Sequence, residues 1–197
     1  AGACAPARQD RAVRHSGWSG SWTPFRQHWR GAAGAEAGFR PGWTSIRRGA
    51  QSVRFVTTLA EASPHNRAVR LNERMWRLGS VCEIFLKYRE DRYVELHVTP
   101  ENRRLQLDWP LDGLASIRLG GARLEDFMVE DEGWCRTATS VGPRGWRIEV
   151  ELPFGGPDLR AAVCRYDCSL EGRPLLSSSA PLAEAAFHRW WEWPRVG

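Results

Sequence analysis

The sequence predicts an all-β fold: an antiparallel, jelly-roll-like β-sandwich with little helix. Three observations lead to this prediction. Short runs alternate apolar and polar residues, turn-forming residues separate those runs, and the 197 residues include eleven tryptophans. Alternation with a period of two is typical of strands that bury one face. Several such strands, joined by short turns that contain Gly and Pro, favour two stacked antiparallel sheets.

The N-terminal half begins with an expected edge strand in the tryptophan-rich stretch 17–29, GWSGSWTPFRQHW. The next strand is expected at 51–59, QSVRFVTTL, where one face is formed by Val53, Phe55, Thr57 and Leu59. A nearly continuous apolar run at 81–88, VCEIFLKY, is typical of a central strand.

The middle of the chain has the pattern of a hairpin followed by a further strand. The polar stretch KYREDR, 87–92, suits a turn that joins 81–88 to a strand at 92–98, RYVELHV. TPENR at 99–103 then turns the chain into a strand at 104–109. In RYVELHV the apolar side chains share one face, and the opposite face carries Tyr93, Glu95 and His97. We interpret that polar face as a candidate floor for a groove.

The C-terminal part is expected to contain strands at 134–140, 145–153 and 160–168, with one short helix at 122–130. GWRIEVELP, 145–153, alternates strictly. A closing strand is expected at 187–193, FHRWWEW, with Trp193 and Val196 as core anchors. The alternative is a helix, in which one stripe would hold Ala186, Trp190 and Trp193.

The composition of the chain bears on its domain organisation and on its relation to membranes. No linker divides the chain, so we predict a single monomeric domain at 17–197 after a disordered lead-in at 1–16. No run approaches 18 apolar residues, and a membrane span is therefore not expected. The sequence does not determine the compartment, and we favour a secreted or periplasmic location over a cytoplasmic one.

The charge pattern does not favour a nucleic-acid partner. The formal net charge is +5, from 28 Lys+Arg against 23 Asp+Glu, and Lys87 is the single lysine. The arginines are spread along the whole chain, whereas a nucleic-acid footprint requires a clustered stripe.

The cysteines do not suggest a disulfide framework or a zinc site. Their number is five, so at least one thiol is free. The close pair, Cys164 and Cys168, would lie about 13 Å apart in an extended strand, too far for a disulfide. We interpret the cysteines as small core residues.

No motif for catalysis, metal or cofactor binding is present. The sequence has no phosphate-binding loop, no G-x-S-x-G and no H-E-x-x-H, and its five histidines lack metal-ligand spacing. Glu83 and Glu95 lie on adjacent predicted strands, as paired glycosidase acids can. We interpret them as strand carboxylates, so no enzyme activity, metal or cofactor is expected.

Two segments carry a resemblance to a known family. Residues 73–103, ERMWRLGSVCEIFLKYREDRYVELHVTPENR, place a Trp before a V-x-E-I-F-L strand and a Y-x-E-L-x-V-x-P strand. Residues 187–196, FHRWWEWPRV, form a final aromatic segment. With supporting matches at 145–154 and 159–169, residues 18–197 resemble the family-nine carbohydrate-binding modules and related DOMON-like domains.

The resemblance implies a non-catalytic domain that holds a sugar between two aromatic rings. Carried over by position, one ring falls on Trp76 and the other on Phe187, which replaces a Trp. The remaining candidate binding residues are His188, Arg189, Trp190, Glu95 and His97. Aromatic planes pack on the C–H faces of sugars, and charged groups bind the hydroxyls. Glu95 stands where the modules use a basic residue.

Two alternative functions remain open at this level. The chain could be a structural or protein-interaction β-sandwich that binds no sugar, for which a glycan array and calorimetry would stay silent. It could also be a haem or redox module, because some DOMON-like domains bind haem through Met and His. The chain offers Met75 and Met128 for that role.

Overall fold

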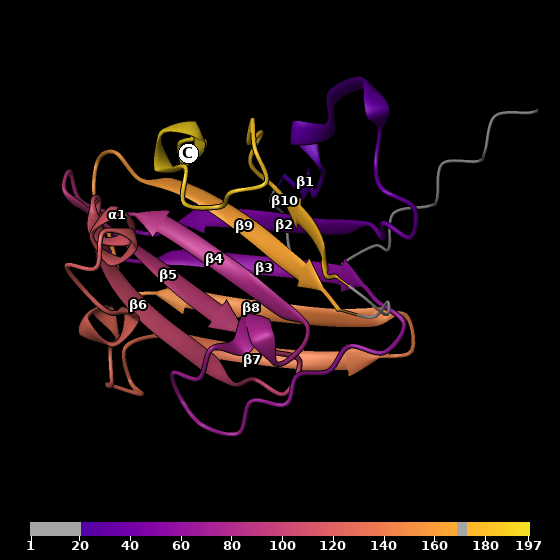
Figure 1. Ribbon diagram of the computed structural model, residues 1–197, viewed down its shortest axis with the longest axis horizontal. Coiled ribbons are helices and arrows are strands. Elements are labelled where there is room, and N and C mark those ends of the chain that lie inside the picture. The colour runs from indigo at the N-terminus through magenta and orange to yellow at the C-terminus, as the bar shows by residue number, and fades with distance from the viewer. Residues whose placement is uncertain (1–20, 169–172) are drawn as a thin grey trace, which may run out of the picture.

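The computed structural model describes residues 21–168 and 173–197, and within them ten strands form two five-stranded antiparallel sheets (Figure 1). The first sheet has the order β1 (Thr23–Pro24), β2 (Gly42–Arg48), β3 (Val53–Ala60), β8 (Gly145–Leu152), β7 (Arg136–Gly142). The second has the order β10 (Leu175–Ser178), β9 (Arg160–Asp167), β4 (Val81–Lys87), β5 (Arg92–Val98), β6 (Arg104–Pro110). The predicted all-β sandwich is confirmed.

The helical elements are short, as predicted. Within the described residues they are one α-helix, α1 (Gly113–Arg118), and four 3₁₀ turns: η1 (His28–Ala33), η2 (Met75–Arg77), η3 (Leu124–Phe127) and η4 (Trp190–Glu192). The helix expected at 122–130 is η3, whereas α1 was not predicted. No helix in the described part of the chain is long and apolar enough to cross a bilayer.

The first core lies between the sheets and follows the predicted alternation. Phe55 of β3 and Ile148 of β8 point inward from the first sheet, and Ile84 and Leu96 point inward from the second. All four are at most 1% exposed. Each such side chain stabilises the fold by about 1.5–3 kcal/mol through apolar burial.

A second core covers the other face of the second sheet. Val81 and Phe85 of β4 lie on this face with Trp109 of β6, and the C-terminal residues Leu182 and Trp193 pack over them. Trp193 is fully buried, as predicted. A sheet that is covered on both faces explains why residues 81–87 are apolar almost without interruption.

The hairpin between β4 and β5 has the predicted partners. Cys82 lies opposite Val98 and Lys87 opposite Tyr93 in the antiparallel register. Gly79, just before β4, has φ +150°, and a Cβ there would lie 2.4 Å from the carbonyl oxygen of His65. Glycine is therefore required where the chain enters β4 beside residues 65–66.

The closing strand predicted at 187–193 is wrong. The segment is irregular and ends in the turn η4, and the only strand-like pairing near the C-terminus is an isolated bridge between Arg160 and Arg195 in the described residues. A strand would expose one of its two aromatic faces. The turn instead buries Trp193, while Trp191 is 53% exposed. Val196 is half-buried against the first core.

The remaining differences lie at the edges of the sheets. The edge strand predicted at 17–29 is the two-residue β1, which pairs with β2. The strands β2 and β10 were not predicted. Cys82, Cys135, Cys164 and Cys168 are free thiols; the first three are buried, as expected of core residues, whereas Cys168 is half-buried. The lead-in predicted at 1–16 lies outside the described residues, as does Cys4.

Candidate functional site

A pocket of about 810 Å³ opens over the second core. Its walls come from three parts of the chain: η2, the segment 114–125 that includes the ends of α1 and η3, and the C-terminal segment 184–191. The Trp, Tyr and Phe rings that line it are Trp76, Trp109, Tyr166, Phe187 and Trp191. The strands contribute the buried polar side chains of Glu83, Glu95 and His97 to the pocket, and the C-terminal segment contributes His188.

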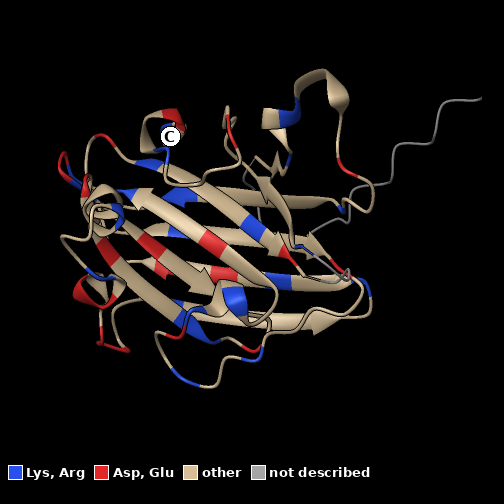
Figure 2. Cartoon of the chain, in the orientation of Figure 1, with Lys and Arg blue, Asp and Glu red and all other residues tan. Residues whose placement is uncertain are grey.

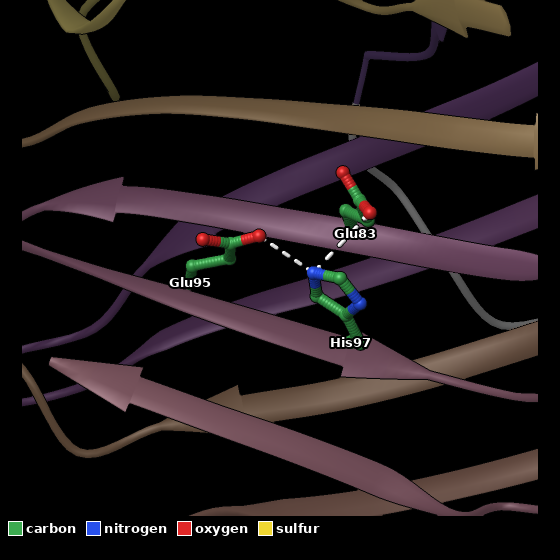
Figure 3. A group of neighbouring side chains, drawn as sticks. All are labelled: Glu83, Glu95 and His97. Atoms are coloured by element: carbon green, nitrogen blue, oxygen red, sulfur yellow. Dashed lines mark hydrogen bonds and ion pairs between the residues drawn. The ribbon is translucent and has the colours of Figure 1, made fainter. Parts of the chain in front are cut away.

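The register of β4 and β5 brings three polar side chains together on the pocket floor. Glu83 pairs with His97 across the two strands, and Glu95 lies two residues before His97 on the same face. His97 Nε2 lies 2.6 Å from Glu95 Oε1 and 3.2 Å from Glu83 Oε1 (Figure 3). All three residues are at most 4% exposed. Figure 2 shows such acidic positions within otherwise uncharged stretches of these strands.

Glu95 is held as an anion by several donors. Trp109 Nε1 donates to Glu95 Oε2 at 2.8 Å, and His188 Nε2 lies 3.6 Å from the same oxygen. Burial alone would raise the pKa of Glu95. The nearby His188 and His97, with hydrogen bonds from His97 and Trp109, outweigh burial and hold that pKa below its ordinary value.

Glu83 and His97 are both shifted towards their protonated forms. Burial, reinforced by the charge of Glu95, raises the pKa of the Glu83 carboxyl to about 8, against the opposing effect of His97. Burial alone would lower the pKa of His97, but Glu83 and Glu95 together raise it. At neutral pH the floor therefore combines the Glu95 carboxylate with a protonated Glu83 carboxyl and the imidazole of His97. It can donate and accept hydrogen bonds to hydroxyl groups.

His188 is oriented by Tyr93. The Tyr93 hydroxyl lies 2.8 Å from His188 Nδ1, and burial raises the pKa of Tyr93, which keeps the phenol protonated. Because Nε2 faces the carboxylate of Glu95, we assign the proton of a neutral His188 to Nε2 and the acceptor role to Nδ1. Burial lowers the pKa of His188, which favours this neutral form.

Six of the seven residues expected at a binding site line this one pocket, and Trp190 is the exception. Trp76 is half-buried in η2, and its ring lies edge-on to His97, with centroids 5.5 Å apart and planes at 68°. Glu95 and His97 lie on the floor, and the side chain of His188 is 25% exposed. The six residues lie up to 113 positions apart in the chain, from 76 to 189.

Phe187 does not present the open ring face that was expected of it. It lines the pocket but is 5% exposed, because its ring packs among Trp29, Phe85 and Tyr166. The expected clamp between Trp76 and an open Phe187 is therefore corrected. Trp191 is the exposed ring of the C-terminal segment.

Arg189 and Trp190 support Trp191. Arg189 Nε donates to Glu192 at 2.7 Å, and the guanidinium lies 5.1 Å from the centre of the Trp191 ring. Trp190 is half-buried, is not among the residues that line the pocket, and meets Trp191 edge-to-face at 5.7 Å.

Trp109 and Trp191 were not among the expected site residues. The run RLQLDW places Leu105, Leu107 and Trp109 on one face, beside the face of Glu95 and His97. That alternation was a usable signal for Trp109. Trp191 had no such signal, since its exposure depends on the turn that replaces the expected strand.

Comparisons with known proteins show what the fold resembles. No family model and no curated protein sequence matches the chain. Among solved structures, a putative carbohydrate-binding protein from Bacteroides uniformis superposes with a TM-score of 0.69 at 14% identity, covering 90% of this chain and 85% of the other.

Two more similar structures are of a family 9 carbohydrate-binding module from Caldicellulosiruptor kristjanssonii. The complex with glucose has a TM-score of 0.59 at 11% identity, covering 90% of this chain and 83% of the other. The complex with cellotriose has a TM-score of 0.56 at 10% identity, covering 82% and 73%. At these identities the likeness shows a shared fold, and the chain has a fold like that of family 9 modules.

Proposed function

We propose that the chain is a non-catalytic carbohydrate-binding domain whose pocket receives a sugar against Trp76. The observation that carries the proposal is the composition of the pocket: aromatic rings line the same 810 Å³ hollow as Glu95, His97 and His188. A sugar has flat apolar C–H faces and hydroxyl groups around its edge. A pocket lined by both aromatic rings and polar side chains can bind both parts.

The role of each side chain in the proposed site follows from its exposure and its contacts. Trp76 supplies a half-exposed indole at one wall, and Trp191 supplies an exposed one at the rim. Glu95, His97 and His188 supply acceptors and donors to hydroxyls, and Arg189 holds Trp191 in place. Phe187 lines the pocket but is 5% exposed, so its ring offers a ligand little surface. The structures with a similar fold include complexes with glucose and cellotriose, which supports sugar as the ligand class.

The test is a glycan array followed by calorimetry, with two tryptophan variants. Trp76→Ala should weaken binding of any captured sugar about tenfold or more, since aromatic stacking contributes about 0.5–1.5 kcal/mol beyond buried area. Trp43→Ala is the matched control, because Trp43 is 40% exposed and lies on β2 of the other sheet. Circular dichroism and the melting temperature confirm that both variants fold.

Two results would reject the proposal. One is an array on which no saccharide is captured, which would favour the structural or protein-interaction alternative. The other is an equal loss of affinity in Trp76→Ala and Trp43→Ala, which would show that sugar binding does not depend on this pocket. A Soret band in the purified protein would instead support the haem alternative.

A further inference from the structure

The pocket floor holds one carboxylate with many partners and one with almost none. Glu95 accepts hydrogen bonds from His97 and Trp109 and faces His188. Glu83 makes no hydrogen bond to the described residues. Among those residues its one ion-pair partner is His97, whose Nε2 lies 3.2 Å from Glu83 Oε1. The same Nε2 lies closer to Glu95 Oε1, at 2.6 Å.

Glu83 is nonetheless 96% buried at a wall of the pocket, with 4% of its surface exposed. One oxygen lies towards His97 and the other points away from it (Figure 3). A buried carboxylate ordinarily accepts several hydrogen bonds, and leaving one without them is costly. Because Glu83 lines the pocket, its unused hydrogen-bonding capacity is open to a ligand there.

The cations around the pocket do not supply the missing partner. Arg74 pairs with Glu125 at 2.9 Å, and Arg189 pairs with Glu184 and Glu192. Arg118 lies at the exposed C-terminal end of α1. The rim charges are thus largely balanced among themselves, while the floor places two carboxyl groups around one shared imidazole.

One wall favours a cation as well. Trp109 packs between Tyr93 and Phe127, and the Trp191 ring already carries the Arg189 guanidinium. The half-exposed indole of Trp76 is therefore the one that a ligand can use. The faces of indole rings attract ammonium groups that lie within about 6 Å of the ring centre. Once Glu83 is ionised, its carboxylate and the indole of Trp76 together stabilise a desolvated ammonium.

We infer that the sugar this pocket selects carries a free, protonated amino group, which binds at Glu83 while the ring packs against Trp76. The inference rests on the proposed function and names its ligand class. Neutral sugars and N-acetylated sugars present no cation to Glu83, and they should bind more weakly.

Binding of the amine should also release a proton. In the empty pocket Glu83 has a pKa of about 8 and is protonated at neutral pH. The incoming ammonium keeps its own proton and stabilises the carboxylate, so the Glu83 proton passes to the buffer. The other titratable groups that interact with the charge of Glu83 are Glu95, His97, Cys82, Cys164 and Tyr166. His188 and Arg118 line the same pocket.

The test is isothermal titration calorimetry at about pH 6, two units below the pKa of Glu83. The probes are β-1,4-linked tetrasaccharides of glucosamine, N-acetylglucosamine and glucose. We expect the glucosamine oligomer to bind about tenfold or more tightly than the other two. Its apparent enthalpy should differ between phosphate and bis-Tris buffers, which both buffer near this pH, by an amount that corresponds to the release of about one proton.

Two variants test whether the preference for the glucosamine oligomer depends on Glu83. Glu83→Gln should bind all three oligomers alike, with an enthalpy independent of the buffer. Glu125→Gln is the matched control, because Glu125 lines the same pocket but is exposed and paired with Arg74, and it should keep the preference.

The outcomes separate the two proposals. Equal or tighter binding of the glucose oligomer by the native chain overturns the amine inference and leaves sugar binding intact. An unchanged preference in Glu83→Gln overturns it too. If Glu83→Gln does not fold, the buffer comparison on the native chain decides, and release of no proton rejects the inference. Binding of no saccharide at all removes the proposed function and this inference together.

Discussion

Arg165 connects the two sheets through a fully buried charge network, and its removal should be among the most destabilising changes in the chain. Arg165 lies on β9 of the second sheet, 1% exposed. It donates to Glu61 at 3.3 Å and to Asp167 at 2.7 Å, and also to the carbonyl oxygens of Ala60 and Arg40. Glu61 and Ala60 belong to the end of the first sheet.

The magnitude follows from what Arg165→Met would leave behind. Glu61 is 1% exposed and Asp167 2% exposed, so two carboxyl groups would lose their shared cation without access to water. Removal of one partner from a buried pair costs about 3–5 kcal/mol. Glu61 keeps hydrogen bonds from Ser80 and from Trp146 Nε1. We therefore expect about 4 kcal/mol, a large share of the roughly 5–15 kcal/mol that stabilises a typical domain.

The assay is urea unfolding followed by tryptophan fluorescence at neutral pH. With a slope of about 2 kcal/mol/M, a loss of 4 kcal/mol lowers the midpoint by roughly 2 M. Arg136→Met, on the exposed edge strand β7, is the control and should change stability by less than about 0.5 kcal/mol. A loss below about 1 kcal/mol in Arg165→Met would refute the reasoning, because the network would then contribute no more than surface charges do.

Three further predictions concern the pocket. Burial raises the folded-state pKa of Glu83 to about 8, so its contribution to stability is complete below its unfolded pKa of about 4.3 and is lost as the pH rises to 8. Urea unfolding at several pH values should show the native chain losing a few kcal/mol over that window and Glu83→Gln losing distinctly less; parallel curves would contradict this. Trp193→Ala should cost about 3–5 kcal/mol, because Trp193 is fully buried and donates to the carbonyl of Phe187 at 3.0 Å, and a melting temperature within a degree or two of the native value would disprove it. Tyr93→Phe removes the partner of His188 Nδ1 and should cost about 1 kcal/mol of stability while altering the His188 ring shifts in NMR titration; unchanged shifts would exclude the contact.

The predictions that succeeded rest on local alternation. Phe55, Ile148 and Leu96 were expected to face a core, and they do, since a strand sends alternate side chains to opposite faces whatever lies around it. The hairpin from β4 to β5 was likewise visible, because turn residues separate two apolar runs.

The predictions that failed concern segments whose structure depends on distant partners. A strand was predicted at 187–193 because aromatic residues such as Phe187 and Trp193 are common in strands. Packing against the second core and the ion pair between Arg189 and Glu192 favour a turn instead. Phe187 was expected to be an open ring, and its burial depends on Trp29, which lies 158 residues earlier in the sequence.

The sequence by itself determined that this chain forms antiparallel strands with one apolar face, and that Glu95 and His97 share the other face of one strand. Only the tertiary structure decided that this second face is buried as well, under η2, α1 and the C-terminal segment. The physical reason is that alternation reports the direction of a side chain but not what covers it. A carboxylate such as Glu83 becomes part of a site only when a distant segment removes the water around it.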